Sequence, residues 1–190
     1  MPEQPPSHHT PDWARRARAL WRWVGAERPP FAQVPAPGEE SVWDYPRPPR
    51  IEASPREVVV RAGGVEVART RRALRVLETA SPPTYYLPPD DVAAGVLVRA
   101  AGGSRCEWKG TAAYWSVVAG DAVLDAAAWS YPEPLPGFEA VAGYVSFYPA
   151  RVACSLDGVP VTPQPGEFYG GWVTPDVVGP FKGEAGSGGW

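Results

Sequence analysis

Alternating apolar and polar positions predict β-hairpins through the middle of the chain. Two pairs of short runs are each joined by a glycine-containing turn, Gly63-Gly64 in the first pair and Ala119-Gly120-Asp121 in the second. Tight hairpin turns need positive φ angles, which glycine adopts without steric cost. The paired runs are 57–62 with 65–69, and 111–118 with 122–129. A further strand over 152–156 is predicted to turn at Asp157-Gly158 into 159–161.

Helical spacing predicts a few short helices around these strands. Near the N-terminus the apolar residues Trp13, Ala17, Leu20, Trp21 and Val24 recur at this spacing opposite arginines, with Asp12 as the cap and Gly25 as the stop. A second helix is predicted from Asp90-Asp91 towards Val98. A third follows from Phe138, Val141, Val145 and Tyr148, which fall on one helical face. Residues 101–105 are expected to form a loop, and 72–79 fits both periods.

The flanks of the chain lack such patterns. We expect a flexible tail over residues 1–11 and an extended, proline-rich surface connector over 26–50. Beyond 163, Gly-Gly-Trp occurs at 170–172 and again at 188–190, which indicates an extended strap on the body or, alternatively, a lid over it. The predicted organisation is an arm and connector (1–50), a β domain (51–163) and a C-terminal strap (164–190).

Composition narrows the class of protein. The 190 residues include 25 Pro and 20 Gly, which exclude a helical bundle, and nine Trp, eight Tyr and five Phe, which argue against disorder. The net charge of −3 disfavours a nucleic-acid-binding face. Apolar stretches are too short to span a membrane, and the N-terminus does not resemble a secretory signal. We therefore expect a cytoplasmic protein without nucleic-acid or membrane partners.

Histidine and cysteine limit the chemistry that the fold can contain. Both histidines, His8 and His9, lie in the N-terminal tail, and Cys106 and Cys154 are expected to be free thiols. We therefore predict neither a metal site nor a cofactor, and no histidine-based triad within the body. Acid–base groups of an enzyme would have to be Asp, Glu, Tyr, Lys or Cys.

The segment Cys106-Glu107-Trp108-Lys109-Gly110 carries the main candidate chemistry. Lysine occurs only at positions 109 and 182, against 16 arginines, so an ammonium is of interest at Lys109. A neighbouring cation favours the thiolate of Cys106, and Glu78 or Asp91 would accept a proton. The alternative is a buried structural cysteine with a lysine extended to the surface.

Aromatic residues are dense on the predicted strands and at their ends. Apolar walls with a few convergent polar groups form ligand sites, so some of these rings are expected to line a cleft and others to fill the core. The candidate ligand-binding residues are Tyr85, Tyr86, Tyr114, Trp129 and Tyr131.

Five short segments occur along the chain in a characteristic order: 73–79, 83–88 with Asp91, 106–110, 129–132 and 143–148. Together they resemble the domain of unknown function 427 family, also labelled putative nucleotidyltransferases. The resemblance implies a small, mainly β (α+β) antiparallel domain akin to the β-tent folds of methionine sulfoxide reductase B and the cereblon ligand-binding domain. Relatives of that fold hold a structural zinc with two cysteine pairs, which this chain lacks. Nucleotidyl transfer needs spaced carboxylates for Mg²⁺, whereas the adjacent Asp90 and Asp91 would point apart on an extended chain.

Three classes of function remain open at this point. The first is a small-molecule-binding β domain, and the second is an enzyme that uses Cys106, Lys109 and Glu78 or Asp91 without a metal. The third is a protein-interaction module. The N-terminal helix either packs on its own domain or binds a membrane surface, a partner or a second copy in a homo-oligomer.

Overall fold

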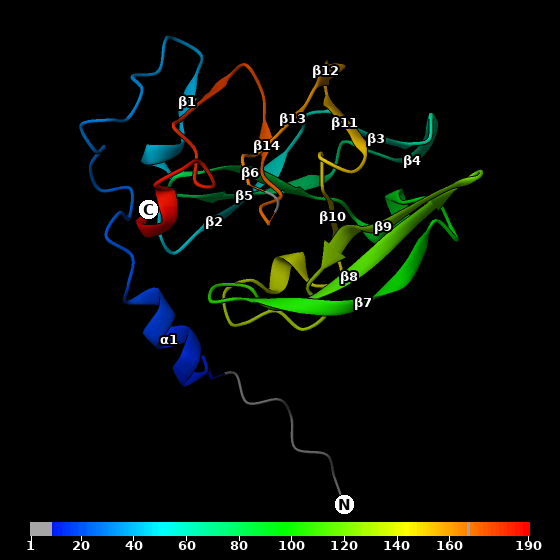
Figure 1. Cartoon of the computed structure of the whole chain (residues 1–190), viewed down its shortest axis with the longest axis horizontal. Helices are drawn as coiled ribbons and strands as arrows, with labels where there is room; N and C mark the ends of the chain where they lie inside the picture. Colours follow the sequence, from blue (N-terminus) through cyan, green and yellow to red (C-terminus); the bar gives the residue numbers. More distant parts are fainter. Residues whose placement is uncertain (1–8, 167) are drawn as a thin grey trace, which may run out of the picture.

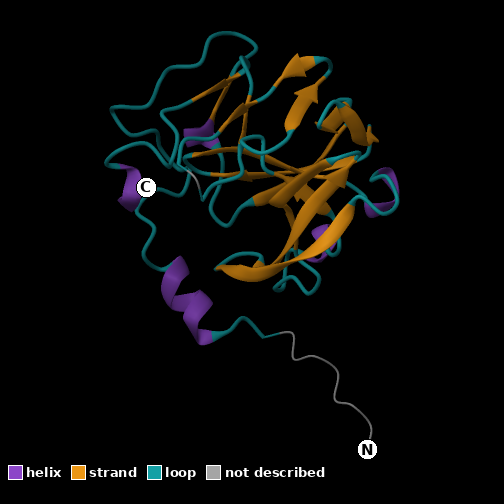
Figure 2. Ribbon diagram, turned by 45° about the vertical axis from the view of Figure 1, so that its right-hand side comes forward, coloured by secondary structure: helices purple, strands orange, loops and turns teal. Residues whose placement is uncertain are grey.

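A computed structural model describes residues 9–166 and 168–190 and shows a mainly β fold built from antiparallel sheets (Figure 1). This confirms the predicted fold class. Most of the predicted flexible tail, including His8, lies outside the described residues. The described residues form one short α-helix, α1 Asp12–Arg18, which lies outside the sheets (Figures 1 and 2).

The three longest strands and one short strand form a four-stranded antiparallel sheet, in the order β10-β9-β8-β7. We call it the long-strand sheet. Its strands are β7 Leu97–Cys106, β8 Gly110–Ala119, β9 Ala122–Ser130 and β10 Val145–Phe147.

Two further sheets pack against the long-strand sheet. One has the order β12-β11-β3-β4, and the other, which we call the cavity sheet, has the order β2-β5-β6. The strands of the first are β3 Val58–Ala62, β4 Val65–Thr70, β11 Ala153–Leu156 and β12 Val159–Pro160. The cavity sheet contains β2 Arg50–Ser54, β5 Ala73–Glu78 and β6 Ser81–Tyr86.

Short strand pairs attach the flanks to this body. A parallel pair joins the connector to the strap, and an antiparallel pair lies within the C-terminal region. The strands are β1 Glu40–Ser41 with β15 Val177–Val178, and β13 Thr162–Pro163 with β14 Trp172–Val173. Single 3₁₀ turns are η1 Val42–Asp44, η2 Pro89–Asp91, η3 Glu139–Val141 and η4 Ser187–Gly189.

Strand alternation divides the apolar side chains between two cores. On β6, Tyr85 points into the core between the long-strand sheet and β3, where its ring packs against Trp172 at 5.2 Å between centroids. Its neighbour Tyr86 points the other way, into a second core with Trp129 and Tyr131. Successive residues of a strand face opposite sides of the sheet, so the two adjacent tyrosines cannot share one surface.

The predicted hairpins are confirmed, whereas the predictions of two helices within the β domain are wrong. β3–β4, β8–β9 and β11–β12 pair as the alternation indicated. The segment after Asp90-Asp91 is only the turn η2, and the predicted loop 101–105 belongs to β7. The predicted helix over 138–148 is η3 followed by β10. The apolar residues of this segment pack into the two cores. The pairing of β10 with β9 decides the structure here, although the spacing of these residues also fits a helix.

Both flanks pack on the body. Helix α1 ends six residues before the predicted Val24, and Arg18 Nε donates to the Glu107 carbonyl oxygen at 2.8 Å. The connector is not only a surface segment, because the Trp43 side chain is fully buried. In the strap, Trp172 Nε1 donates to the Phe147 carbonyl oxygen at 3.0 Å. Among the described residues, no helix has the length and apolar character that a membrane span requires.

Candidate functional site

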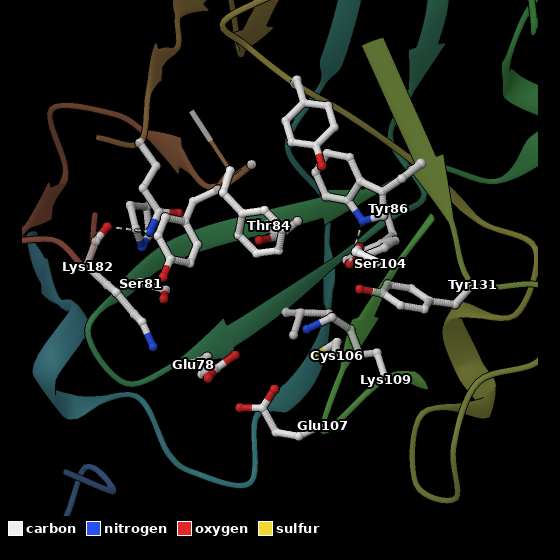
Figure 3. A pocket seen from close by; sticks show the side chains of 18 of the residues that line it. Glu78, Ser81, Thr84, Tyr86, Ser104, Cys106, Glu107, Lys109, Tyr131 and Lys182 are labelled. Carbon is white, nitrogen blue, oxygen red and sulfur yellow. Dashed lines mark hydrogen bonds between the residues drawn. The ribbon is translucent and has the colours of Figure 1, made fainter. Parts of the chain in front are cut away.

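A cavity of about 270 Å³ lies between the cavity sheet and the long-strand sheet (Figure 3). Side chains from both sheets line it, together with residues of the N-terminal arm and of the C-terminal strap. The lining residues are Trp21, Val76, Glu78, Ser81, Pro82, Thr84, Tyr86, Ser104, Arg105, Cys106, Glu107, Lys109, Trp129, Tyr131, Tyr148, Gln164, Phe168, Tyr169, Gly170 and Lys182.

The β5–β6 hairpin forms one wall of the cavity. On β6, the even-numbered residues Pro82, Thr84 and Tyr86 line the cavity, as the two-residue period of a strand requires. Glu78 ends β5 and enters the same space just before the hairpin turn. The wall therefore combines an apolar surface with a hydroxyl, a phenol and a carboxylate.

The turn between β7 and β8 carries Cys106, Glu107 and Lys109 into the cavity (Figure 3). The chain can reverse here because Gly110 adopts a φ of 99°, which is unfavourable for residues with a Cβ. Trp108, in the same turn, packs beneath the Arg18 guanidinium at 4.8 Å from the ring centroid. The N-terminal arm thus holds the turn that presents the ionisable side chains.

Lys109 is a buried cation, with only 9% of its surface exposed. Burial acts to lower its pKa, but the neighbouring Cys106, Tyr86 and Glu78 outweigh burial and raise the pKa above the ordinary 10.5. The ammonium therefore keeps its proton across the physiological range. Within the described residues, the one hydrogen-bond acceptor of its Nζ is the Cys106 sulfur, which is a weak acceptor.

Two phenols lie beside Lys109. The Lys109 Nζ is 5.9 Å from the centroid of Tyr131, whose ring lies 6.3 Å from that of Tyr86. Burial raises the pKa of Tyr86 to about 12 and raises that of Tyr131 well above its usual 10. Both hydroxyls therefore stay protonated and can donate hydrogen bonds. Trp129 Nε1 already donates to the Tyr86 oxygen at 3.3 Å.

The opposite end of the cavity is built around the Trp21 ring. Lys182 Nζ lies 3.5 Å from the ring centroid, and the Arg47 guanidinium lies 4.2 Å from it. Burial, followed by repulsion from Arg47, lowers the pKa of Lys182 to about 8. The Lys182 ammonium also donates to the Trp190 carbonyl oxygen at 3.2 Å.

The two carboxylates of the cavity already have partners at this end. Glu78 accepts from Arg47 Nε at 3.2 Å, in an ion pair whose arginine side chain is 1% exposed. Glu107 accepts from Trp21 Nε1 at 2.7 Å. The cavity is thus polar at both ends, with donors at the Lys109 end and paired charges at the Trp21 end.

Most of the predicted site residues come together in this cavity: Cys106, Lys109, Glu78, Tyr86, Trp129 and Tyr131. The other three lie elsewhere. Asp91 accepts from Thr70 and from Arg72 outside the cavity. Tyr85 is part of the main core, and Tyr114 packs against the second core without lining the cavity.

Sequence reasoning missed the contribution of the flanks. Trp21, Gln164, Tyr169 and Lys182 all line the cavity, although they lie in the arm and the strap. One signal was present in the sequence: the chain has only two lysines, and both of them are in this cavity.

The residues present do not fit the magnesium-nucleotide chemistry that the nucleotidyltransferase label implies. Within residues 9–166 and 168–190, no group of three His, Cys, Asp or Glu side chains could hold a metal ion. The Asp91 carboxylate is engaged by an arginine, and Asp90 belongs to the same 3₁₀ turn.

The fold and the cavity define a small antiparallel β domain with a cavity lined by aromatic rings, to which the N-terminal arm and the C-terminal strap contribute side chains. The family model for the domain of unknown function DUF427 matches residues 50–158, and the chain belongs to this family. This confirms the resemblance seen in the sequence. No curated protein matches the chain. The matched region contains Glu78, Cys106 and Lys109, whereas Trp21 and Lys182 lie outside it.

Proposed function

We propose that this protein binds a small organic molecule in the cavity between its two sheets. The observation that carries the proposal is the cavity of about 270 Å³, walled by Tyr86, Trp129, Tyr131 and Tyr148. Ligand pockets combine apolar walls with a few polar groups that fix the orientation of the ligand. The lower end of their usual volume range is about 300 Å³. The ligand is therefore small, on the scale of one or two rings.

Aromatic packing supports this proposal. The rings of Trp129 and Tyr148 are 4.3 Å apart between centroids, and Tyr86 meets Trp129 edge-on at 6.2 Å. These contacts fix the rings that line the cavity, so the wall keeps its shape without a ligand. A preformed site loses little conformational entropy when the ligand binds.

A panel of one- and two-ring compounds, neutral and charged, tests the proposal. About ten heavy atoms at about −0.3 kcal/mol each give about −3 kcal/mol, so the compounds are supplied at several millimolar. Saturation-transfer NMR on the full chain is expected to detect binding of at least one compound. Thr84→Phe, which places a ring in the cavity, is expected to abolish that binding.

Thr111→Phe is the matched control, because it makes the same change at an exposed position on β8. It is expected to leave binding unchanged. Binding that survives Thr84→Phe in a folded protein, or a panel from which no compound binds, contradicts the proposal.

The contact between Cys106 and Lys109 favours a second candidate, an enzyme with a thiol nucleophile. An ammonium beside a thiol stabilises the thiolate, which is the reactive form. This candidate predicts that bound compounds are converted or form an adduct on Cys106, and that Cys106→Ser abolishes the reaction but keeps the binding. Turnover that persists in Cys106→Ser excludes it.

A further inference from the structure

Three hydrogen-bond donors line one end of the cavity, and no oxygen of the described residues accepts a hydrogen bond from any of them. The Lys109 ammonium carries three N–H groups, and within the described chain its acceptor is the Cys106 sulfur. The Tyr131 hydroxyl lines the same space and has no hydrogen-bond partner among the described residues. Tyr86 accepts from Trp129, so its own proton is available to donate.

A buried ammonium without a strong acceptor is costly, because burial removes its hydration. Such a group is stabilised by a ligand that supplies the missing acceptor. Figure 3 shows Lys109, Cys106 and Tyr131 close together on one side of the cavity, away from Lys182. We infer that this end is a receptor for an anionic oxygen group, and that the ligand is a planar ring compound with a single carboxylate.

The charge at this end favours a monoanion. Lys109 supplies one positive charge there, and the phenols of Tyr86 and Tyr131 are neutral donors. The Glu78 carboxylate also acts on Lys109, although its hydrogen bond is to Arg47. A phosphate group carries about −1.5 to −2 at neutral pH. Its second charge would be repelled by Glu78, and the arginine of the lining, Arg105, is exposed and lies over the Trp13 ring at 5.8 Å.

The volume limits the rest of the ligand. A cavity of about 150 Å³ holds benzene. The 270 Å³ measured here therefore accommodates a substituted single ring or a fused pair of rings. Trp129, which donates to Tyr86, and Tyr148, which packs on Trp129, line the cavity beside the donors and provide faces for such a ring. This inference rests on the proposed function, because it names the class of ligand for the same cavity.

Three compounds with one ring system separate charge from shape: indole-3-acetate, indole-3-acetamide and tryptamine. Isothermal titration calorimetry with the full chain is expected to show the acetate binding at least about 10-fold more tightly than the acetamide, because hydrogen bonds to charged groups are the stronger ones. Tryptamine is expected to bind more weakly still. Lys109→Met is expected to abolish the preference for the acetate.

Lys182→Met is the matched control, since it removes the other lysine of the cavity and is expected to keep the preference. If the acetamide or tryptamine binds as tightly as the acetate to the wild-type chain, the anionic class is overturned while small-molecule binding stands. If none of the three binds although other ring compounds do, the anionic class is likewise overturned. The wild-type comparison decides this even where Lys109→Met does not fold.

Discussion

Lys182 gives the sharpest prediction about the ionisation of the cavity. Burial against the Trp21 ring and repulsion from Arg47 lower its pKa from 10.5 to about 8. At pH 9, about nine-tenths of the Lys182 amines are therefore neutral, against about 3% for a lysine with the ordinary value. Lys109 is expected to remain charged at the same pH, because its pKa is raised.

The assay is a pH titration of the protein labelled with ¹³C and ¹⁵N in lysine. The chain contains only two lysines, so two side-chain signals are expected, and Lys182→Met identifies one of them by removing it. The Lys182 signal is expected to shift with a midpoint near pH 8, while the Lys109 signal stays constant to beyond pH 10. A Lys182 midpoint above pH 10 refutes the reasoning about its burial.

The same shift has a consequence for stability. Since the folded pKa of Lys182 lies below its unfolded value, the unfolded chain binds this proton more tightly between about pH 8 and 10.5. The contribution of Lys182 to the free energy of unfolding therefore rises with pH across that window. Lys182→Met is expected to remove this rise, whereas Arg16→Met, at an exposed position of α1, is expected to keep it.

Two further predictions concern the strap and the thiols. A Cβ on Gly170 would lie 2.7 Å from Trp129 Cζ3, so Gly170→Ala is expected to lower the free energy of unfolding in urea by about 1–3 kcal/mol. Gly188→Ala, which meets no atom within 4 Å, is expected to change it by less than about 0.5 kcal/mol, and equal effects would contradict the close packing of the strap. Iodoacetamide is expected to modify only Cys106 in the native chain and both thiols after denaturation, because Cys154 is buried and burial raises its pKa. Fast modification of both thiols in the native chain, measured by intact mass, would contradict this.

Local signals in the sequence predicted the hairpins, because alternation and glycine turns act over a few neighbouring residues. The same reasoning failed over 138–148, where the spacing of Phe138, Val141, Val145 and Tyr148 fits a helix. Pairing of Val145–Phe147 with β9 decides that structure, and a long-range pairing leaves no trace in local periodicity.

In the candidate site, too, local features were predictable from the sequence and long-range contacts were not. Lys109 and Cys106 share one turn, and their unusual residue types marked them in the sequence. The prediction that both Tyr85 and Tyr86 bind a ligand was wrong for Tyr85, which lies in the main core because neighbouring residues of a strand face opposite sides. The position of Lys182 in the cavity was not predictable from local patterns, because Lys182 lies in the C-terminal strap, far from Lys109 in the sequence. It depends on the path of an irregular strap, held by contacts such as Gln164 Nε2 to the Lys182 carbonyl oxygen at 2.7 Å.

A crystal structure of the full chain with indole-3-acetate tests the role of the donors around Lys109 most directly. The predicted result is an indole ring between the two sheets, with a carboxylate oxygen about 2.7–3.2 Å from the Lys109 Nζ. A carboxylate bound at Lys182 instead, or an indole ring found only outside the cavity, would contradict the account.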